Sequence, residues 1–311
     1  MKRPITKSDS SPMDIHDLTV FAAATRHGSV TKAAQSLSTV QSNVTARIRI
    51  LETELKVQLF HRNHRGITLT EKGRQLLPYA QQMLSLVENA KAAVAESHEV
   101  RGTLQIGALQ STASARLPDI LKVYAARHAR VDIGVETGTS ADLTAKVLES
   151  RLDGAFVSGV EDHPDLDVIR SHVEELVIIT PAPYRTVKAY LKQCTLPKPL
   201  VFKTGCHYRQ RLERYLGDEG ASVLNPMEFG TIDGIIGCVA AGLGISMLPR
   251  SVVERSARKR DVSIHELAKP HRYVETQFVT HKAQVRSIAL ARLIDVITSE
   301  RDRVKAGRRT A

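Results

Sequence analysis

The chain has 311 residues, and its 44 lysine and arginine residues exceed its 33 aspartate and glutamate residues to give a formal net charge of +11 at pH 7. Because one domain usually holds about 100–200 residues, this length predicts two or three domains, and the charge indicates a polyanionic partner such as nucleic acid rather than an anionic membrane surface. Three cysteines without a Cys-x-x-Cys pair exclude a disulfide framework and a zinc site, and no apolar run approaches the ~18 residues of a membrane span, so we expect a soluble cytoplasmic protein that binds no metal.

The N-terminal region opens with a polar leader, residues 1–12, which we expect to be disordered. A first helix is predicted from Asp14 to His27, because apolar residues recur there at helical spacing. Gly28 is placed to end that helix, and Ser29 can cap the next one.

The stretch "KAAQSLSTVQSNVTARIRILETEL" predicts two amphipathic helices with a break near Ser38–Thr39. Small residues on the first helix allow another helix to come close, as a helix-turn-helix requires. On the second helix, a buried stripe is predicted from Val44, Ile48, Leu51 and Leu55. The opposite face carries short, polar or basic side chains, namely Ser42, Thr45, Ala46 and Arg49. This face indicates a reader of the DNA major groove, and the alternative is a helical hairpin with a solvated face on a protein that is merely basic.

The stretch "LFHRNHRGITLTEKG", Leu59 to Gly73, predicts a short hairpin with a basic tip. Arg62 and Arg65 at this tip would contact phosphates and fix the register on DNA without reading its sequence. Joined to the preceding helices, the hairpin predicts a winged helix-turn-helix.

A long helix is expected from Glu71 to about Glu99. Its apolar residues alternate steps of four and three, through Leu76, Ala80, Met83, Val87, Ala90 and Val94. Such a narrow seam is typical of a helix that pairs with a second copy of itself, so we expect dimerisation. Packing of the seam against its own domain is the alternative.

Beyond residue 102, short apolar runs alternate with helical stretches, which predicts a largely parallel α/β architecture. The runs are "TLQIGA", "VDIGVET", "LDGAFVS", "LVIIT", "LVFKTG", "GISMLP" and "QFVTH". Because ligands bind at the carboxyl ends of strands in such sheets, the residues that follow the runs are candidate ligand contacts. They are Ser111, Thr112, Thr139, Ser140, Ser158, Cys206, His207 and Thr231. Their hydroxyl groups, with His207 and Arg209 nearby, favour a small anion such as a carboxylate.

The sequence resembles the LysR-type transcriptional regulators from about Met13 to nearly its end. The N-terminal match is specific, because "FAAATRHGSVTKAAQSLSTVQSNVTARIRILETELKVQLFHRNHRGITLTEKG" contains the Gly-Ser turn, the Ala-Ala helix, the Leu-Phe-x-Arg motif and the Leu-Thr-x-x-Gly motif of that family. The C-terminal match is looser and lies in "RGTLQIGA", "LESRLDGAFVSG" and "AAGLGISMLP". The resemblance implies a winged helix-turn-helix, a long linker helix and an α/β regulatory domain of two Rossmann-like subdomains, like periplasmic binding proteins, with a small-molecule cleft between them.

The implied domains are a DNA-binding domain (13–72), a linker or dimerisation helix with a hinge (73–102), regulatory subdomain I (103–172 plus 274–300), regulatory subdomain II (173–273) and a basic tail (301–311). The predicted DNA contacts are Lys32, Gln41, Ser42, Thr45, Arg49, Arg62 and Arg65. Val40 departs from the polar residue, often serine, that the family commonly has there, and Thr45 replaces a common serine while keeping its hydroxyl group.

The resemblance implies double-stranded DNA, an unidentified small-molecule effector and a homo-oligomer, a dimer of dimers, as partners. RNA polymerase is a further candidate partner, and neither a cofactor nor a membrane is expected. We therefore expect a transcription regulator that binds a partly palindromic promoter site. We do not expect an enzyme, because the sequence shows no pairing of a nucleophile with a base.

Two alternatives stay open. The first is a thiol-based redox regulator, because His207 and Arg209 near Cys206 could favour its thiolate, as in the peroxide-sensing members of the family. The second is a binding-protein-like enzyme fused to a DNA-binding head, for which the only support is likeness of fold.

Overall fold

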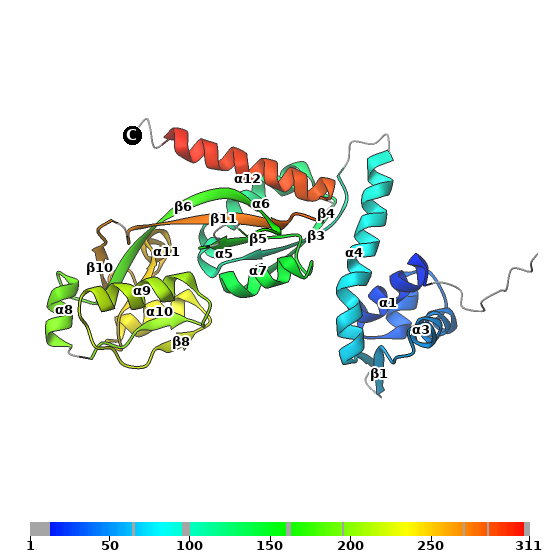
Figure 1. The fold of residues 1–311 in the computed structure, drawn as a ribbon, viewed down its shortest axis with the longest axis horizontal. Coiled ribbons are helices and arrows are strands. Elements are labelled where there is room, and N and C mark those ends of the chain that lie inside the picture. The colour runs from blue at the N-terminus through cyan, green and yellow to red at the C-terminus, as the bar shows by residue number, and fades with distance from the viewer. Residues whose placement is uncertain are drawn as a thin grey trace, which may run out of the picture. The chain divides into compact units, whose positions relative to one another are not determined.

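The computed structural model describes residues 13–63, 66–94, 100–159, 163–194, 196–269, 271–284 and 286–307. The chain forms two compact units, residues 1–98 and 99–311. In Figure 1 the first unit is coloured blue to cyan and the second runs through green and yellow to red. Each unit has its own hydrophobic core. No helix in the described ranges is both long enough and apolar enough to cross a membrane.

The N-terminal unit is a winged helix-turn-helix followed by a long helix, as predicted. Its elements are α1 (Ile15–His27), α2 (Val30–Ser36), α3 (Gln41–Leu55), β1 (Phe60–Asn63), β2 (Gly66–Leu69) and α4 (Glu71–Val94). Gly28 ends α1 with a left-handed φ of 59°, and the Ser29 side chain accepts the Lys32 backbone N–H at 3.4 Å. Both predicted caps are therefore confirmed. β1 and β2 pair antiparallel to form the wing.

The core of this unit is built where the helical periodicity predicted it. Val44, Ile48 and Leu51 of α3 are at most 2% exposed, which confirms the predicted stripe. Ala33 of α2 is fully buried, so its small side chain lets the neighbouring helices approach closely. The wing joins this core through Phe60.

The predicted seam of α4 divides between two faces. Ala80 is 1% exposed and, with the half-buried Leu76, packs into the core of its own unit. For these two residues the structure corrects the predicted contact with a second copy, because the face they occupy is already covered by the helix-turn-helix. Met83 is 43% exposed and Val87 is half-buried, while the side chain of Val94 lies outside the described residues.

The exposed apolar side chains of α4 share Met83 with the predicted seam and otherwise lie beside it. Tyr79 is 66% exposed and Leu86 is 51% exposed, and together with Met83 they follow steps of four and three residues. We call Tyr79, Met83 and Leu86 the α4 stripe. Its spacing is that of a heptad seam, and it differs from the predicted seam at Leu76 and Ala80, which the domain itself covers.

The C-terminal unit contains a seven-stranded sheet in the order β10-β6-β11-β5-β3-β4, with β9 also paired to β6, and a two-stranded sheet of β7 and β8. The strands are β3 (Gly102–Ala108), β4 (Val131–Thr137), β5 (Gly154–Ser158), β6 (Leu166–Pro181), β7 (Leu200–Phe202), β8 (Met227–Phe229), β9 (Ser246–Pro249), β10 (Val262–Glu266) and β11 (Tyr273–His281). The helices are α5 (Gln110–Ala115), α6 (Leu117–Arg127), α7 (Ser140–Leu148), α8 (Val187–Gln193), α9 (His207–Asp218), α10 (Ile232–Ala240), α11 (Arg250–Arg255) and α12 (Ile288–Gly307).

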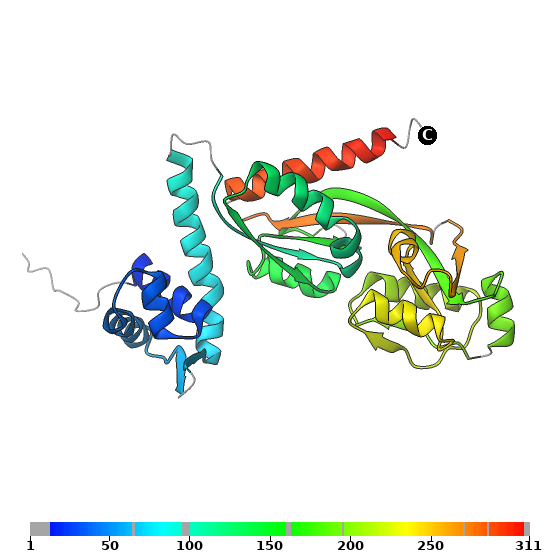
Figure 2. The same cartoon turned by 180° about the vertical axis from the view of Figure 1, so that it is seen from behind.

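Every predicted apolar run contributes residues to a strand, but the expectation of a largely parallel sheet is wrong. β3 pairs parallel with β4 and β5, whereas β11 pairs antiparallel with β5 and β6, and β6 pairs antiparallel with β9 and β10. The reason is that β6 and β11 are long strands that run in opposite directions through the unit, as both views show (Figures 1 and 2).

β6 passes between two halves of the C-terminal unit. Its residues up to Glu175 pair with β11, and from Leu176 onward it pairs with β9 and then β10. The half that holds β3, β4 and β5 is thus joined to the half that holds α8, α9 and α10 by two adjacent strands (Figure 2). We call these the β3 half and the α9 half.

Candidate functional site

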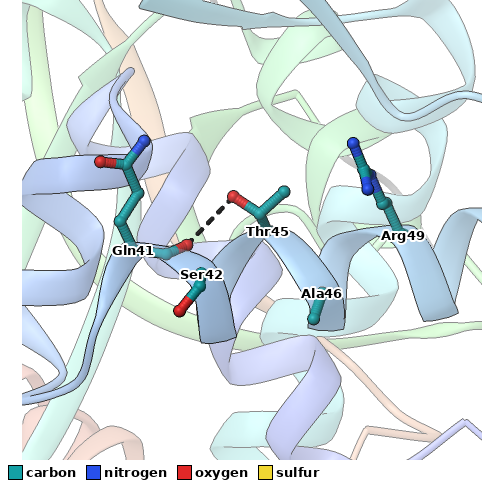
Figure 3. A pocket seen from close by; sticks show the side chains of 5 residues that line it. All are labelled: Gln41, Ser42, Thr45, Ala46 and Arg49. Carbon is teal, nitrogen blue, oxygen red and sulfur yellow. Dashed lines mark hydrogen bonds between the residues drawn. The ribbon is translucent and has the colours of Figure 1, made fainter.

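The outward face of α3 is the first candidate site. A shallow, open depression lies on this face, which is the face that the helical periodicity predicted. It is lined by Gln41, Ser42, Thr45, Ala46 and Arg49. Figure 3 shows Gln41, Thr45 and Arg49 projecting to the same side of the helix. Their spacing of four residues places successive side chains about 6 Å apart along the axis.

Each of these three side chains has defined hydrogen-bonding capacity. The Thr31 hydroxyl donates to Gln41 Oε1 at 3.2 Å, so the Gln41 amide nitrogen keeps its N–H groups for another acceptor. Thr45 Oγ1 donates to the Gln41 carbonyl oxygen at 3.0 Å, as Figure 3 marks, and therefore presents its methyl group and oxygen lone pairs. Arg49 is exposed, and its guanidinium group has no hydrogen-bonding or charged partner among the described residues.

The other predicted DNA contacts lie around this helix. Lys32 is exposed on α2. Arg62 lies in β1 of the wing, but its side chain is outside the described residues, and so is all of Arg65. Val40 is the N-cap residue of α3 and is 64% exposed. Its carbonyl oxygen accepts the Asn43 N–H at 3.1 Å, but its side chain offers no acceptor, so it does not cap the N–H groups that open the helix.

The second candidate site is a cleft of about 530 Å³ between the β3 half and the α9 half. The β3 half contributes the lining residues Leu109, Gln110, Ser111, Thr137, Gly138, Thr139 and Asp142. The α9 half contributes Phe202, Lys203, Thr204, Cys206, Tyr208, Phe229 and Gly230. A volume of this size suits a small organic ligand. The Gln110 Nε2 group spans the cleft, because it donates both to Thr137 Oγ1 at 3.3 Å and to the Gly230 carbonyl oxygen at 3.2 Å.

Three of the predicted ligand contacts line this cleft: Ser111, Thr139 and Cys206. The other five do not, because each has a role within the fold. Ser140 Oγ accepts the Ser158 N–H at 3.0 Å, and Thr231 Oγ1 accepts the Gly234 N–H at the start of α10.

The remaining predicted residues are also placed away from the cleft lining. The Ser158 hydroxyl lies 3.3 Å from Thr276 Oγ1, and Thr112 is fully buried, with no hydrogen-bond partner for its Oγ1 in the described part of the chain. The His207 ring packs so closely on Gly159 that a Cβ atom there would lie 2.5 Å from it.

The cleft lining also contains polar residues that the sequence did not single out, chiefly Gln110, Lys203, Thr204 and Tyr208. Gln110 adjoins the predicted Ser111, so a wider window after that strand would have included it. Tyr208 carried no signal, since an aromatic residue on an amphipathic helix is usually a core residue.

The most buried part of the cleft is a hydrogen-bonded group of three side chains. Tyr208 Oη donates to Oε2 of Glu174, a carboxyl on β6 that is only 3% exposed. Ser111 Oγ lies 2.9 Å from Tyr208 Oη and 3.4 Å from Glu174 Oε2. Burial, followed by the adjacent Glu174 carboxyl, raises the Tyr208 pKa well above its ordinary value. These contacts join α5 of the β3 half, α9 of the other half and the strand that passes between them.

Cys206 is 6% exposed, and burial raises the pKa of its thiol despite the nearby backbone N–H groups and Arg209. The predicted thiolate is therefore disfavoured at this position. Across the described ranges, no three His, Cys, Asp or Glu side chains are grouped so that they could hold a metal ion.

Two family models match the chain. The model described as "Bacterial regulatory helix-turn-helix protein, lysR family" matches residues 15–74, and the "LysR substrate binding domain" matches residues 97–302. Among related proteins, the HTH-type transcriptional regulator GltR of Bacillus subtilis is 39% identical over 279 residues, which cover 90% of this chain and 94% of GltR. The uncharacterised HTH-type regulator YusT of the same organism is 41% identical over 287 residues, which cover 92% of this chain and 96% of YusT.

Solved structures show the same fold at low sequence identity. ArgP from Mycobacterium tuberculosis has a TM-score of 0.66 at 19% identity, with coverage of 92% of this chain and 97% of ArgP. Full-length CbnR in complex with its target DNA has a TM-score of 0.63 at 18% identity, with coverage of 92% of this chain and 99% of CbnR. The predicted pairing of a winged helix-turn-helix with a two-part α/β domain is thereby confirmed.

Proposed function

Because the chain belongs to the LysR family of bacterial transcriptional regulators, we propose that it binds a partly palindromic promoter site as a homo-oligomer and that a small molecule in the cleft controls this binding. Its relatives are DNA-binding regulators rather than enzymes. The observation that carries the proposal is the outward face of α3, where Gln41, Thr45 and Arg49 project in a row with their hydrogen-bonding groups available.

Base reading is assigned to these three side chains. The Gln41 amide N–H groups suit acceptors on base edges, and the Thr45 methyl group suits the methyl group of thymine. Arg49 suits the O6 and N7 atoms of guanine, because its guanidinium can donate two parallel hydrogen bonds. A helix of this kind enters the major groove with its N-terminal half, which holds Gln41 and Thr45, and the long Arg49 side chain follows one turn later on the same face, which supports base contacts by all three residues.

Phosphate contacts are assigned to groups beside the reading face. Lys32 supplies a positive charge on α2, and the N-terminus of α3 offers backbone N–H groups that Val40 does not cap. Helix N-termini bind phosphate through such N–H groups and the helix dipole. These contacts, with Arg62 and Arg65 of the wing, would fix the position of α3 without selecting a sequence.

Oligomer formation is assigned to α4. The α4 stripe, Tyr79, Met83 and Leu86, leaves large apolar side chains exposed at the spacing that two paired helices bury. Pairing there would bring two reading helices to one site, which matches a partly palindromic operator. We further propose that two such dimers assemble into a tetramer.

Effector binding is assigned to the cleft, where donors point inward from both walls. Thr139 Oγ1 accepts the Asp142 N–H at 3.2 Å, and Thr204 Oγ1 accepts from Arg209 Nη1 at 3.1 Å. Because these oxygens already accept, each hydroxyl proton is left to donate to a ligand. Together with the Lys203 ammonium group, they support a ligand that carries a carboxylate.

The effector acts by preferring one arrangement of the two halves. A ligand that contacts Thr139 on one wall and Thr204 on the other binds best when the halves are close, and only this difference in affinity can shift the oligomer. The redox alternative is less favoured, since burial raises the pKa of the Cys206 thiol and so disfavours its thiolate.

DNA binding of the full chain tests the proposal, with fluorescence anisotropy on the promoter region upstream of its own gene. Arg49→Ala should weaken specific binding by about 1–3 kcal/mol and relax the preference at one base position. Lys32→Ala is the matched control and should weaken all DNA sequences alike, with a salt dependence reduced by about one counterion. If both variants lose affinity equally on every sequence, α3 does not read bases through Arg49.

A further inference from the structure

The deep and shallow parts of the cleft differ in hydrogen-bonding polarity. At its floor lie Ser111, 1% exposed, and Tyr208, 4% exposed. Nearer the surface lie Thr139, Thr204 and Lys203, which are half-buried or exposed. A ligand that fills the cleft meets both parts, so the protons available in each part determine which chemical groups it must carry.

The two hydroxyl groups at the floor have no proton left to donate to a ligand. The Tyr208 hydroxyl donates to the Glu174 carboxylate, which can only accept. Ser111 must therefore direct its own proton inward, to Tyr208 Oη at 2.9 Å and Glu174 Oε2 at 3.4 Å. Each hydroxyl has one proton, so both oxygens offer only lone pairs to a ligand.

Negative charge lies directly behind these acceptors. Glu174 is 3% exposed, and its Oε1 atom accepts no hydrogen bond from any residue that the structure describes. Its ion-pair partner within the described ranges is His172, whose Nε2 atom is 3.6 Å from Oε1. A ligand ammonium group at the floor would be attracted by this charge in a site with little water.

The charged residues that line the cleft are balanced rather than positive. The Lys203 ammonium group has no hydrogen-bonding or charged partner among the described residues, and Asp142 pairs with Lys146 at 2.9 Å. Lys146 also pairs with Glu136, so this corner of the cleft keeps a net negative charge. The donors on the upper walls favour a carboxylate, but the cleft as a whole does not favour a ligand that is only an anion.

We propose that the effector is a zwitterion, an amino acid or a close analogue, whose carboxylate meets Thr139, Thr204 and Lys203 and whose ammonium group meets Ser111 and Tyr208. This inference rests on the proposed function of the cleft and narrows the small anion to a molecule with both charges. Leu109, Phe202 and Phe229 provide apolar contacts for the carbon chain between the two groups.

Isothermal titration calorimetry of the full chain tests the inference with α- and ω-amino acids of two to six carbons. For each amino acid that binds, the carboxylic acid without the amine and the amine without the carboxylate are titrated as matched probes. Both truncated probes should bind about tenfold to hundredfold more weakly, because the carboxylic acid leaves the buried Ser111 and Tyr208 oxygens without a donor and the amine loses its hydrogen bonds to Thr139, Thr204 and Lys203. A carboxylic acid that binds as tightly as its amino acid would overturn the inference.

Two variants locate the two ends of the ligand. Ser111→Ala removes an acceptor from the floor and should reduce the difference in affinity between the amino acid and the carboxylic acid. Thr204→Val should weaken both by the same factor and leave their difference unchanged. Equal weakening of both probes by Ser111→Ala would contradict the assigned ammonium site.

Promoter binding separates this inference from the function on which it rests. The melting temperature of Ser111→Ala shows whether it is folded, and we expect it to be lower than that of the unaltered chain because the substitution removes the buried hydrogen bond to Tyr208 Oη. If no amino acid in the series binds while the chain still binds promoter DNA specifically, the proposal of a zwitterionic effector is wrong and the proposed DNA-binding function stands.

Discussion

The backbones of Gly28 and Gly66 are in direct contact, because a Cβ atom on Gly66 would lie 2.4 Å from the Gly28 carbonyl oxygen. That oxygen also accepts the Ile67 N–H at 3.0 Å. Gly28 ends α1 and Gly66 begins β2, so the contact fastens the wing to the turn that precedes α2. The orientation of the wing relative to the DNA-reading helix thus depends on two residues without side chains.

Gly66→Ala should detach the wing from this turn. The residue has a φ of 132°, which an alanine rarely adopts, and the new Cβ atom would collide with a backbone atom that cannot move aside. We expect a loss of about 1–3 kcal/mol in the stability of the N-terminal unit and weaker DNA binding. Scanning calorimetry and anisotropy measure the two effects. Gly217→Ala in α9 is the control, because nothing lies within 4 Å of its Cβ position.

Arg47 and Arg49 are two residues apart on α3, but their replacement should affect different properties: the stability of the fold for Arg47 and DNA binding for Arg49. Arg47 Nη1 lies 3.1 Å from Oδ1 of Asp17, whose side chain is 5% exposed. Arg47→Ala leaves this buried carboxylate without its partner and should lower stability by about 1–3 kcal/mol. Arg49→Ala should change stability by less than about 0.5 kcal/mol while it weakens DNA binding. If the two variants melt at the same temperature, the Arg47–Asp17 pair does not stabilise the fold.

Met83→Lys should disrupt the oligomer. A lysine in the α4 stripe would place an unpaired charge between two helices if this face is buried in a dimer. Sedimentation velocity should then show smaller particles, and footprinting should show one protected half-site instead of two. Gln81→Lys, on an exposed part of the same helix outside the stripe, should leave the mass unchanged. An unchanged mass for Met83→Lys would place the dimer contact elsewhere.

The DNA-reading helix could be predicted from the sequence because its periodicity is local. Val44, Ile48 and Leu51 recur at steps of four and three, so the buried side and therefore the exposed side of α3 follow from the sequence alone. A similar periodicity predicted an apolar seam on α4, but it could not predict what covers Ala80. That residue is covered by helices that precede it in the chain, which is a tertiary contact that no spacing within α4 contains.

The ligand cleft was less predictable, because hydroxyl groups after strands serve two purposes. Ser111 lines the cleft and Ser140 and Thr231 satisfy backbone N–H groups, whereas Thr139 does both, since it lines the cleft and accepts the Asp142 N–H. Glu174 was not found, since a carboxyl group in the stretch "SHVEEL" suggests a solvated side chain. Its burial depends on Tyr208, which is distant in sequence and is brought to β6 only by the fold.

Cys206 should react slowly with iodoacetamide at neutral pH. Burial raises the pKa of its thiol, and alkylation requires the thiolate. Cys194 and Cys238 are half-buried, so mass spectrometry after brief labelling should find these two modified before Cys206. Cys206→Ser should accordingly leave the response of promoter binding to peroxide unaltered. Rapid labelling of Cys206 would restore the redox alternative.

The stability of the C-terminal unit should fall as the pH drops below about 6.5, in part because of His265. This residue of β10 is 8% exposed, and its Nε2 atom lies 2.8 Å from the buried Thr180 Oγ1 on β6. Burial lowers the His265 pKa from its ordinary value of 6.5, so the folded chain binds a proton there only at a lower pH than the unfolded chain does. The contribution to stability is therefore complete above pH 6.5 and is lost progressively as the pH falls toward the folded-state pKa.

His265→Gln removes this titration, so its melting temperature should decline less steeply than that of the unaltered chain between pH 7 and pH 5. The difference at pH 8 gives the cost of the substitution itself, and equal slopes for the two proteins would show that His265 does not contribute to the acid sensitivity.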